Sequence, residues 1–128
     1  MKSNIIYNMK KLYFAIVALL LCAISASAVT ITPGTKLYLT PNSNWNESNA
    51  RFAAYFYGNG EAWVSMTKVA GESNLYEVTS PSGKNFTNVI FCRMNPSTTA
   101  NNWNNRWNQT ADLTYDGTKN LYIVKADT

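Results

Sequence analysis

The stretch "RFAAYFYGNGEAWVSM", residues 51–66, carries the clearest structural signal in this chain, because its side chains alternate around a Gly-Asn-Gly turn. In an extended chain Phe52 and Phe56 lie on one face, and Tyr55 and Tyr57 lie on the other. A tyrosine hydroxyl is hydrated more easily at a surface than in a core. We therefore expect the phenylalanines inside and the tyrosines outside, on a strand that is followed by a second strand.

Short segments rich in aromatic and β-branched residues recur along the rest of the chain, and turn-forming sequences separate them. No segment has a helical period long enough to predict a sizeable helix. The sequence therefore predicts an all-β fold, a single-domain antiparallel β-sandwich of immunoglobulin-like type over residues 29–128. The expected strands are 35–40, 51–58, 62–69, 74–80, 87–94, 109–115 and 120–126.

Residues 1–28 have the pattern of a secretory signal peptide. A lysine-containing start precedes the apolar run Leu12–Ile24, and the small-residue triplet Ala26–Ala28 resembles a cleavage signal. The alternative is a membrane anchor, but this run is short for a bilayer span. We expect residues 29–128 to be secreted, to the cell surface, the medium or the periplasm, with no membrane contact after signal removal.

Removal of the signal peptide would change the charge balance. The full sequence has 11 basic and seven acidic residues and a net charge of +4, but three basic residues and no acidic ones lie within the first 28 positions. The remaining chain carries +1 and has no basic stripe. We therefore predict that it does not bind nucleic acid.

Cys92 is the one cysteine outside the expected signal peptide, so no disulfide within the mature chain is expected. In an extended segment it shares a face with Ile90 and Met94. We expect a buried, unreactive thiol. The domain must then depend on packing for its stability.

The sequence offers little for catalysis. It has no histidine, which removes the commonest general base and metal ligand. Its seven carboxylates are scattered without a close pair, and no nucleophile motif or phosphate-binding loop is recognisable. We predict a protein that is not an enzyme and that has no metal site and no cofactor.

The longest irregular segment, Asn95–Asn108, places Trp103 and Trp107 among amide side chains, with Arg106 between them. An indole offers a flat apolar face, and an amide group both donates and accepts hydrogen bonds. A sugar ring matches this combination, since its C–H face fits an aromatic plane and its hydroxyls fit amides. We therefore predict that this segment binds a neutral polysaccharide, with Asn108 among the contacts.

The alternative for these tryptophans is a place in the core. Either Trp103 or Trp107 could fold inward and close one end of the sandwich, much as Trp63 is expected to pack against a sheet face.

Four quoted segments, "LYLTPNSNW", "ARFAAYFYGNGEAWVSM", "TNVIFCRMNP" and "NQTADL", together resemble a known family, from about Lys36 to Leu113. They are similar to starch-binding carbohydrate-binding modules of family 26 and its relative family 25, in the version found in secreted proteins of gut Bacteroidetes. The resemblance implies a β-sandwich that binds α-1,4-glucans, such as starch, glycogen and malto-oligosaccharides. In this family aromatic rings and polar side chains contact the sugar.

The resemblance also implies particular contact residues. Tyr38 corresponds to the aromatic residue of the first strand, Tyr57 to a position where the family often has tryptophan, and Gln109 to an amide that contacts the ligand. The full set of expected ligand-binding residues is Tyr38, Tyr55, Tyr57, Trp103, Arg106, Trp107, Asn108 and Gln109.

A competing hypothesis assigns the same exposed aromatic residues to a protein interface. The chain would then be a secreted interaction or adhesion module without sugar binding. Under either hypothesis the candidate protein partners are a glycoside hydrolase or another envelope protein.

Overall fold

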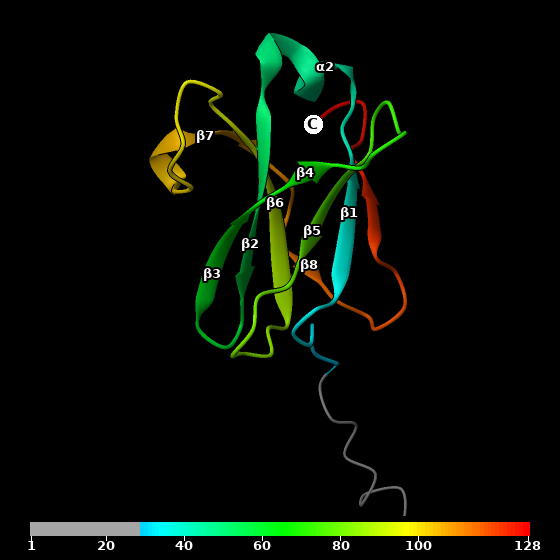
Figure 1. Cartoon of the computed structure of the whole chain (residues 1–128), viewed down its shortest axis with the longest axis vertical. Coiled ribbons are helices and arrows are strands. Elements are labelled where there is room, and N and C mark those ends of the chain that lie inside the picture. The colour runs from blue at the N-terminus through cyan, green and yellow to red at the C-terminus, as the bar shows by residue number, and fades with distance from the viewer. Residues whose placement is uncertain (1–28) are drawn as a thin grey trace, which may run out of the picture.

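The computed structural model describes residues 29–128, so the expected signal peptide at positions 1–28 lies outside the described residues. Two β-sheets pack face to face, and the predicted all-β sandwich is confirmed (Figure 1). The elements are β1 (Lys36–Thr40), α2 (Ser43–Asn46), the 3-10 helix η1 (Glu47–Asn49), β2 (Arg51–Tyr57), β3 (Glu61–Ser65), β4 (Thr67–Lys68), β5 (Tyr76–Thr79), β6 (Asn88–Met94), the 3-10 helix η2 (Trp103–Asn105), β7 (Arg106–Gln109), β8 (Leu113–Thr114) and β9 (Leu121–Ile123).

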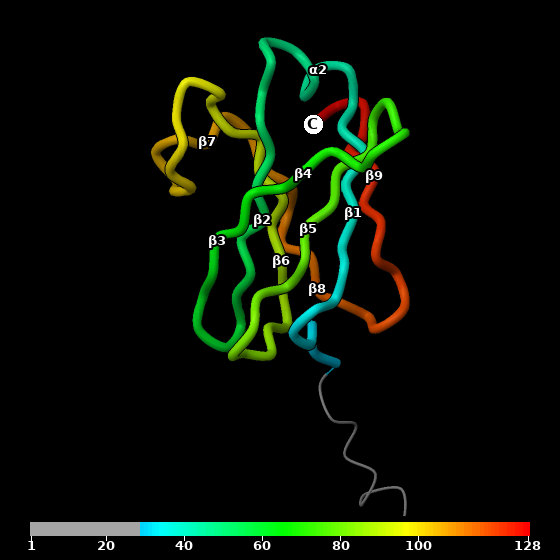
Figure 2. Tube along the Cα trace, in the orientation of Figure 1, coloured from blue at the N-terminus to red at the C-terminus, as the bar shows by residue number. Residues whose placement is uncertain are grey.

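One sheet has the strand order β3-β2-β6-β7, with β8 also paired to β6, and the other has the order β4-β5-β1-β9. The chain crosses between the sheets at Met66, a buried residue between β3 and β4. The predicted strand 62–69 is therefore two short strands in different sheets. The strands are not all antiparallel as predicted, because β9 lies beside β1 in parallel, whereas the other pairs are antiparallel (Figure 2).

The turn between β2 and β3 requires glycine. Gly58 and Gly60 have φ values of 100° and 76°, a region that L side chains rarely adopt. A Cβ atom at Gly58 would also overlap the Thr87 hydroxyl. The turn aligns β2 and β3 so that Tyr55 lies opposite Trp63.

The alternation in β2 separates two apolar clusters. Phe52 and Phe56 are buried between the sheets, as expected, whereas Tyr55 and Tyr57 point away from the other sheet. The core between the sheets contains Ile31, Leu37, Leu39, Trp45, Phe52, Ala54, Phe56, Met66, Val78, Phe86, Val89, Phe91 and Val124.

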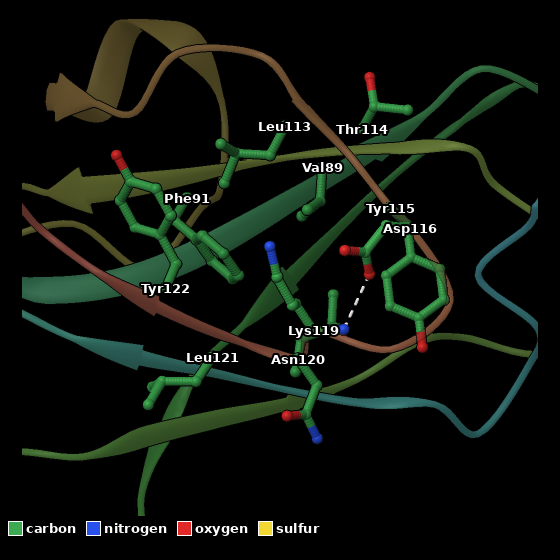
Figure 3. Close-up of a pocket in the computed structure, with 11 residues that line it drawn as sticks. Val89, Phe91, Leu113, Thr114, Tyr115, Asp116, Lys119, Asn120, Leu121 and Tyr122 are labelled. Carbon is green, nitrogen blue, oxygen red and sulfur yellow. Dashed lines mark hydrogen bonds between the residues drawn. The ribbon is translucent and has the colours of Figure 1, made fainter.

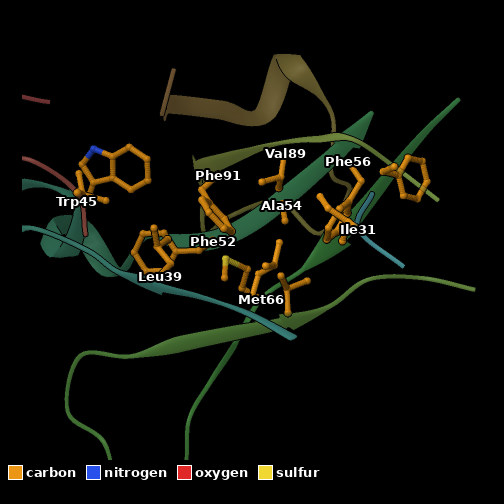
Figure 4. Close-up of a cluster of buried hydrophobic side chains, with 13 residues drawn as sticks. Ile31, Leu39, Trp45, Phe52, Ala54, Phe56, Met66, Val89 and Phe91 are labelled. Carbon is orange, nitrogen blue, oxygen red and sulfur yellow. The ribbon is translucent and has the colours of Figure 1, made fainter. Parts of the chain in front are cut away.

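Trp45 of α2 closes one end of this core (Figure 4). Its ring stacks on Phe52 with the centroids 6.2 Å apart and the planes at 9°. The helix begins at Asn42, whose side-chain oxygen accepts a hydrogen bond from the Trp45 amide at 2.8 Å. The tryptophan inside the sandwich is thus Trp45, in a helical turn that the sequence had not predicted.

The outer face of the five-stranded sheet has its own small cluster. Ala53, Ile90, Cys92 and Met94 are buried there under partly exposed aromatic side chains. Cys92 is fully buried, which confirms the expected buried thiol, and this burial raises the pKa of the thiol to about 12.

Candidate functional site

Four aromatic side chains meet on the outer face of the five-stranded sheet. Tyr55 and Tyr57 come from β2, Trp63 from β3 and Trp103 from η2; we call them the outer-face cluster. The Tyr55 and Tyr57 rings lie 5.5 Å apart with an angle of 19° between their planes, and the Tyr55 and Trp63 rings lie 4.9 Å apart at 47°. Three of the rings are therefore carried by neighbouring strands, which fixes their backbone positions.

Trp103 stands nearly upright against this group. Its centroid lies 4.7 Å from both Tyr55 and Trp63, with interplanar angles of 67° and 69°. Such edge-to-face contacts contribute about 0.5–1.5 kcal/mol each beyond area burial. The indole is still 40% exposed, so it offers surface to a ligand while it is held by its neighbours.

Arg51 at the start of β2 holds the loop that carries Trp103. Its Nε donates to the Asn95 carbonyl at 3.2 Å, and Nη1 donates to Asn101 Oδ1 at 2.5 Å. Nη2 donates to Thr98 Oγ1 at 3.1 Å and to the Ala100 carbonyl at 2.8 Å. One guanidinium thus links a sheet strand to four points on a loop that has little regular structure.

The asparagines of the loop form hydrogen bonds that stabilise its conformation and attach it to β3. Asn101 Nδ2 donates to Ser65 Oγ at 3.0 Å, and Asn105 Nδ2 donates to the Ala100 carbonyl at 2.9 Å. Asn102 caps η2, because its side-chain oxygen accepts from the Asn105 amide at 3.0 Å. The interleaving of amides and tryptophans in the sequence is therefore explained first by loop folding, before any contact with a ligand.

Arg106 and Gln109 border the outer-face cluster. Gln109 lies opposite Cys92 in the strand register, and Arg106 lies opposite Met94, so both face outward. The Arg106 guanidinium is 5.5 Å from the Trp103 ring and hydrogen-bonds to the Gln109 side-chain oxygen. A donor-rich polar edge thus lies beside the exposed indole.

Acidic groups lie beside the two tyrosines. The Tyr55 hydroxyl donates to Glu61 Oε2 at 2.5 Å, and this bond is the main reason that the Tyr55 pKa is raised to about 12. The Tyr57 pKa is raised above its ordinary value mainly by desolvation and to a smaller extent by the negative charge of nearby Asp112. Both hydroxyls are protonated at neutral pH, as tyrosine hydroxyls ordinarily are, and both remain hydrogen-bonding groups.

Trp107 and Asn108 do not join this surface. Trp107 packs instead on the Arg93 guanidinium, 4.7 Å from the ring centroid. Asn108 lies opposite Arg93 in the register, and its side-chain oxygen is 3.5 Å from Arg93 Nη1. Arg93 lies opposite the core residue Phe52 in the register, so its side chain is on the inner side of the sheet. Trp107 and Asn108, which contact Arg93, are therefore on the side opposite to the outer-face cluster.

Tyr38 is further removed, because it belongs to the other sheet. It is half-buried on the outer face of the four-stranded sheet, where it lies opposite Glu77 and Leu121. The eight expected residues therefore occupy three surfaces, and five of them lie together: Tyr55, Tyr57, Trp103, Arg106 and Gln109. Sequence reasoning did not assign Trp63 to the site, although its register with Tyr55 places it there.

A separate cavity of about 300 Å³ opens between β8 and β9 (Figure 3). Its floor is apolar, with Val89 and Phe91, and none of the eight expected residues lines it. Asp116 at its rim accepts hydrogen bonds from the Lys119 and Thr118 amides, which lower the pKa of its carboxyl group. That carboxylate therefore stabilises a turn.

Acidic and cysteine side chains do not gather into a metal-binding group anywhere in residues 29–128. Within the same range, no helix has the length and apolar character needed to cross a membrane.

No protein-family model, curated protein or solved structure matches this chain.

Proposed function

We propose that this protein is a secreted, non-catalytic module that binds neutral α-glucans, such as starch, glycogen and malto-oligosaccharides, at the outer-face cluster. The observation that carries the proposal is the partly exposed Trp103 indole, which is held against Tyr55 and Trp63 and bordered by Arg106 and Gln109. The motif resemblance to starch-binding modules supports the same ligand class.

The arrangement of the rings favours a sugar. Tyr55 and Tyr57 lie side by side along the strand, and Trp103 stands at a steep angle beside Tyr55. Apolar C–H faces of glucose units fit such surfaces, and the strands keep the rings in place before the ligand arrives. Less conformational entropy is then lost on binding.

The polar edge favours an uncharged ligand. Arg106 is bonded to the neutral Gln109, and both side chains keep further hydrogen-bonding groups for sugar hydroxyls. Glu61 and Asp112 lie beside the tyrosines, so an anionic polymer would meet like charge there.

The expected affinity is modest. A ring face that removes about 60 Å² from water contributes about 1.5 kcal/mol. Two ring faces and a few hydrogen bonds, after subtraction of the free energy needed to order the ligand and the loops, correspond to a Kd between about 1 μM and 1 mM.

Native electrophoresis in gels containing amylopectin tests the proposal. We expect retardation of the protein relative to a gel without polysaccharide, and restored mobility when maltoheptaose is added. Unchanged mobility at amylopectin concentrations well above the expected Kd would refute glucan binding.

A second candidate function is supported by a different surface. Leu121 and Ile123 of β9 are 48% and 63% exposed on the same face as Tyr38. Exposed apolar side chains on an edge strand suit a protein interface, for example with a glycoside hydrolase or another envelope protein. If this surface is the functional one, Ile123→Asp should abolish co-purification with the protein partner. The variant should migrate in amylopectin gels as the wild-type protein does.

A further inference from the structure

We infer that Trp107 forms a second glucan-binding site, separate from the outer-face cluster, so that one copy of the domain holds two glucan segments at once. This inference depends on the proposed function, because it assigns the same ligand class to a second surface.

The two tryptophans face in different directions. Trp103 contacts Tyr55 and Trp63 on the outer face, whereas Trp107 lies on Arg93. The pairing of β6 with β7 is irregular between Arg93 and Met94, where an extra residue enters β7. Arg106 and Trp107 therefore point to opposite sides of the strand.

The Trp107 indole has a fixed support. Arg93 Nε donates to the Trp45 carbonyl at 2.9 Å, and Nη2 donates to the Glu47 carbonyl at 2.8 Å. The guanidinium is thereby anchored to the α2–η1 segment, whose Trp45 is buried in the core. With one side of the ring on this support, the indole is still 42% exposed. Such a rigid, open aromatic face is suited to stacking against a sugar ring.

Polar groups for sugar hydroxyls lie beside this indole. The Arg93 guanidinium donates hydrogen bonds to two backbone carbonyls and to the Asn108 amide oxygen. It forms no ion pair within residues 29–128. A guanidinium has five N–H donors, so some remain for a ligand. Asn108 is exposed next to the ring and adds an amide donor.

The consequence is bivalent binding. Because the two sites lie on opposite sides of the sheet, a short oligosaccharide occupies one of them at a time. A branched polymer supplies many segments, so the protein should bridge amylopectin molecules and gain apparent affinity for the polymer.

An NMR titration with maltoheptaose distinguishes one site from two. The chain has four tryptophans and hence four indole N–H signals. Trp107→Phe assigns one signal, while it keeps an aromatic ring on Arg93, and Trp103→Phe assigns another. We expect both the Trp103 and the Trp107 signals to shift, each with its own saturation curve. In Tyr57→Ala, the Trp103 shift should be reduced and the Trp107 shift unchanged.

Turbidity of amylopectin provides a second readout. The wild-type protein should increase it, and Trp107→Ala should not, although that variant should still be retarded in amylopectin gels. Val29→Ala is the matched control, because it truncates an exposed apolar side chain that belongs to neither aromatic site and should behave like wild type.

The outcomes separate the two proposals. A Trp107 signal that stays fixed while the Trp103 signal shifts, or that loses its shift in Tyr57→Ala, overturns the second site and leaves glucan binding intact. If neither signal shifts, both proposals are refuted.

Discussion

Tyr55 of β2 lies directly opposite Trp63 of β3, and their ring centroids are 4.9 Å apart on the outer face of the five-stranded sheet. This pair supports the Trp103 indole, which contacts both rings at 4.7 Å. An irregular loop thus gains a defined position from a regular sheet. That relationship connects the sequence pattern of β2 with the proposed binding surface.

Arg51→Lys should weaken the loop and the site together. A lysine ammonium cannot reproduce the fork that reaches four acceptors between Asn95 and Asn101. We expect the free energy of unfolding to fall by about 1–3 kcal/mol, and glucan affinity to fall about tenfold because Trp103 loses its fixed position. Urea denaturation and amylopectin gels measure the two effects.

Thr98→Ala is the control for this substitution, since it removes one of the four acceptors. A smaller loss of stability and affinity than in Arg51→Lys is expected. If Arg51→Lys unfolds and binds like wild type, Arg51 does not position the loop.

Trp45 should contribute more to stability than Trp103. Trp45→Ala leaves a cavity at the end of the core, and we expect a loss of about 3–5 kcal/mol. Trp103→Ala removes a partly exposed ring and should cost about 1–2 kcal/mol. Chemical denaturation of both variants provides the comparison, and equal losses would contradict the assigned places of the two rings.

Trp45→Phe should be milder than Trp45→Ala. The Trp45 Nε1 atom is buried without a hydrogen-bond partner among residues 29–128, so phenylalanine removes an unsatisfied donor while it keeps most of the ring. We expect Trp45→Phe to lower the free energy of unfolding by at most half as much as Trp45→Ala does. A phenylalanine variant as unstable as the alanine variant would indicate that Nε1 has a partner.

Cys92 should make stability sensitive to alkaline pH. Its pKa is raised from 9.0 to about 12 in the folded protein by burial. Above pH 9 the thiol ionises in the unfolded chain and stays protonated in the folded one, so stability declines as the pH rises from about 9 toward 12. Urea midpoints between pH 7.5 and 10 should fall more steeply for the wild-type protein than for Cys92→Ala. Parallel slopes would contradict this assignment.

The sequence predicted the part of the fold that depends on local pattern. The alternation in β2 placed Phe52 and Phe56 in the core and Tyr55 and Tyr57 outside, and the burial of these residues confirms it. Cys92 was predicted to be buried on the face that it shares with Ile90 and Met94, and all three residues are buried. Period-two alternation decides which face a side chain occupies, as long as the register is regular.

The arrangement of the site depends on contacts that a local pattern does not contain. Arg51 reaches its acceptors across 44 to 50 residues of sequence. The irregularity between Arg93 and Met94 turns Trp107 away from Trp103, and a one-residue shift of this kind reverses the face of each following side chain. Tyr38 was separated from the other tyrosines by the assignment of its strand to the second sheet.

The most direct measurement compares Tyr57→Ala with Tyr38→Ala in amylopectin gels. Both are half-buried tyrosines that face outward, but they lie on opposite sheets. We predict that Tyr57→Ala weakens binding by about 1–2 kcal/mol, seen as reduced retardation, because one ring face is lost. Tyr38→Ala should migrate like wild type. Equal retardation of wild type and Tyr57→Ala, or a loss of retardation in Tyr38→Ala alone, would contradict glucan binding at the outer-face cluster.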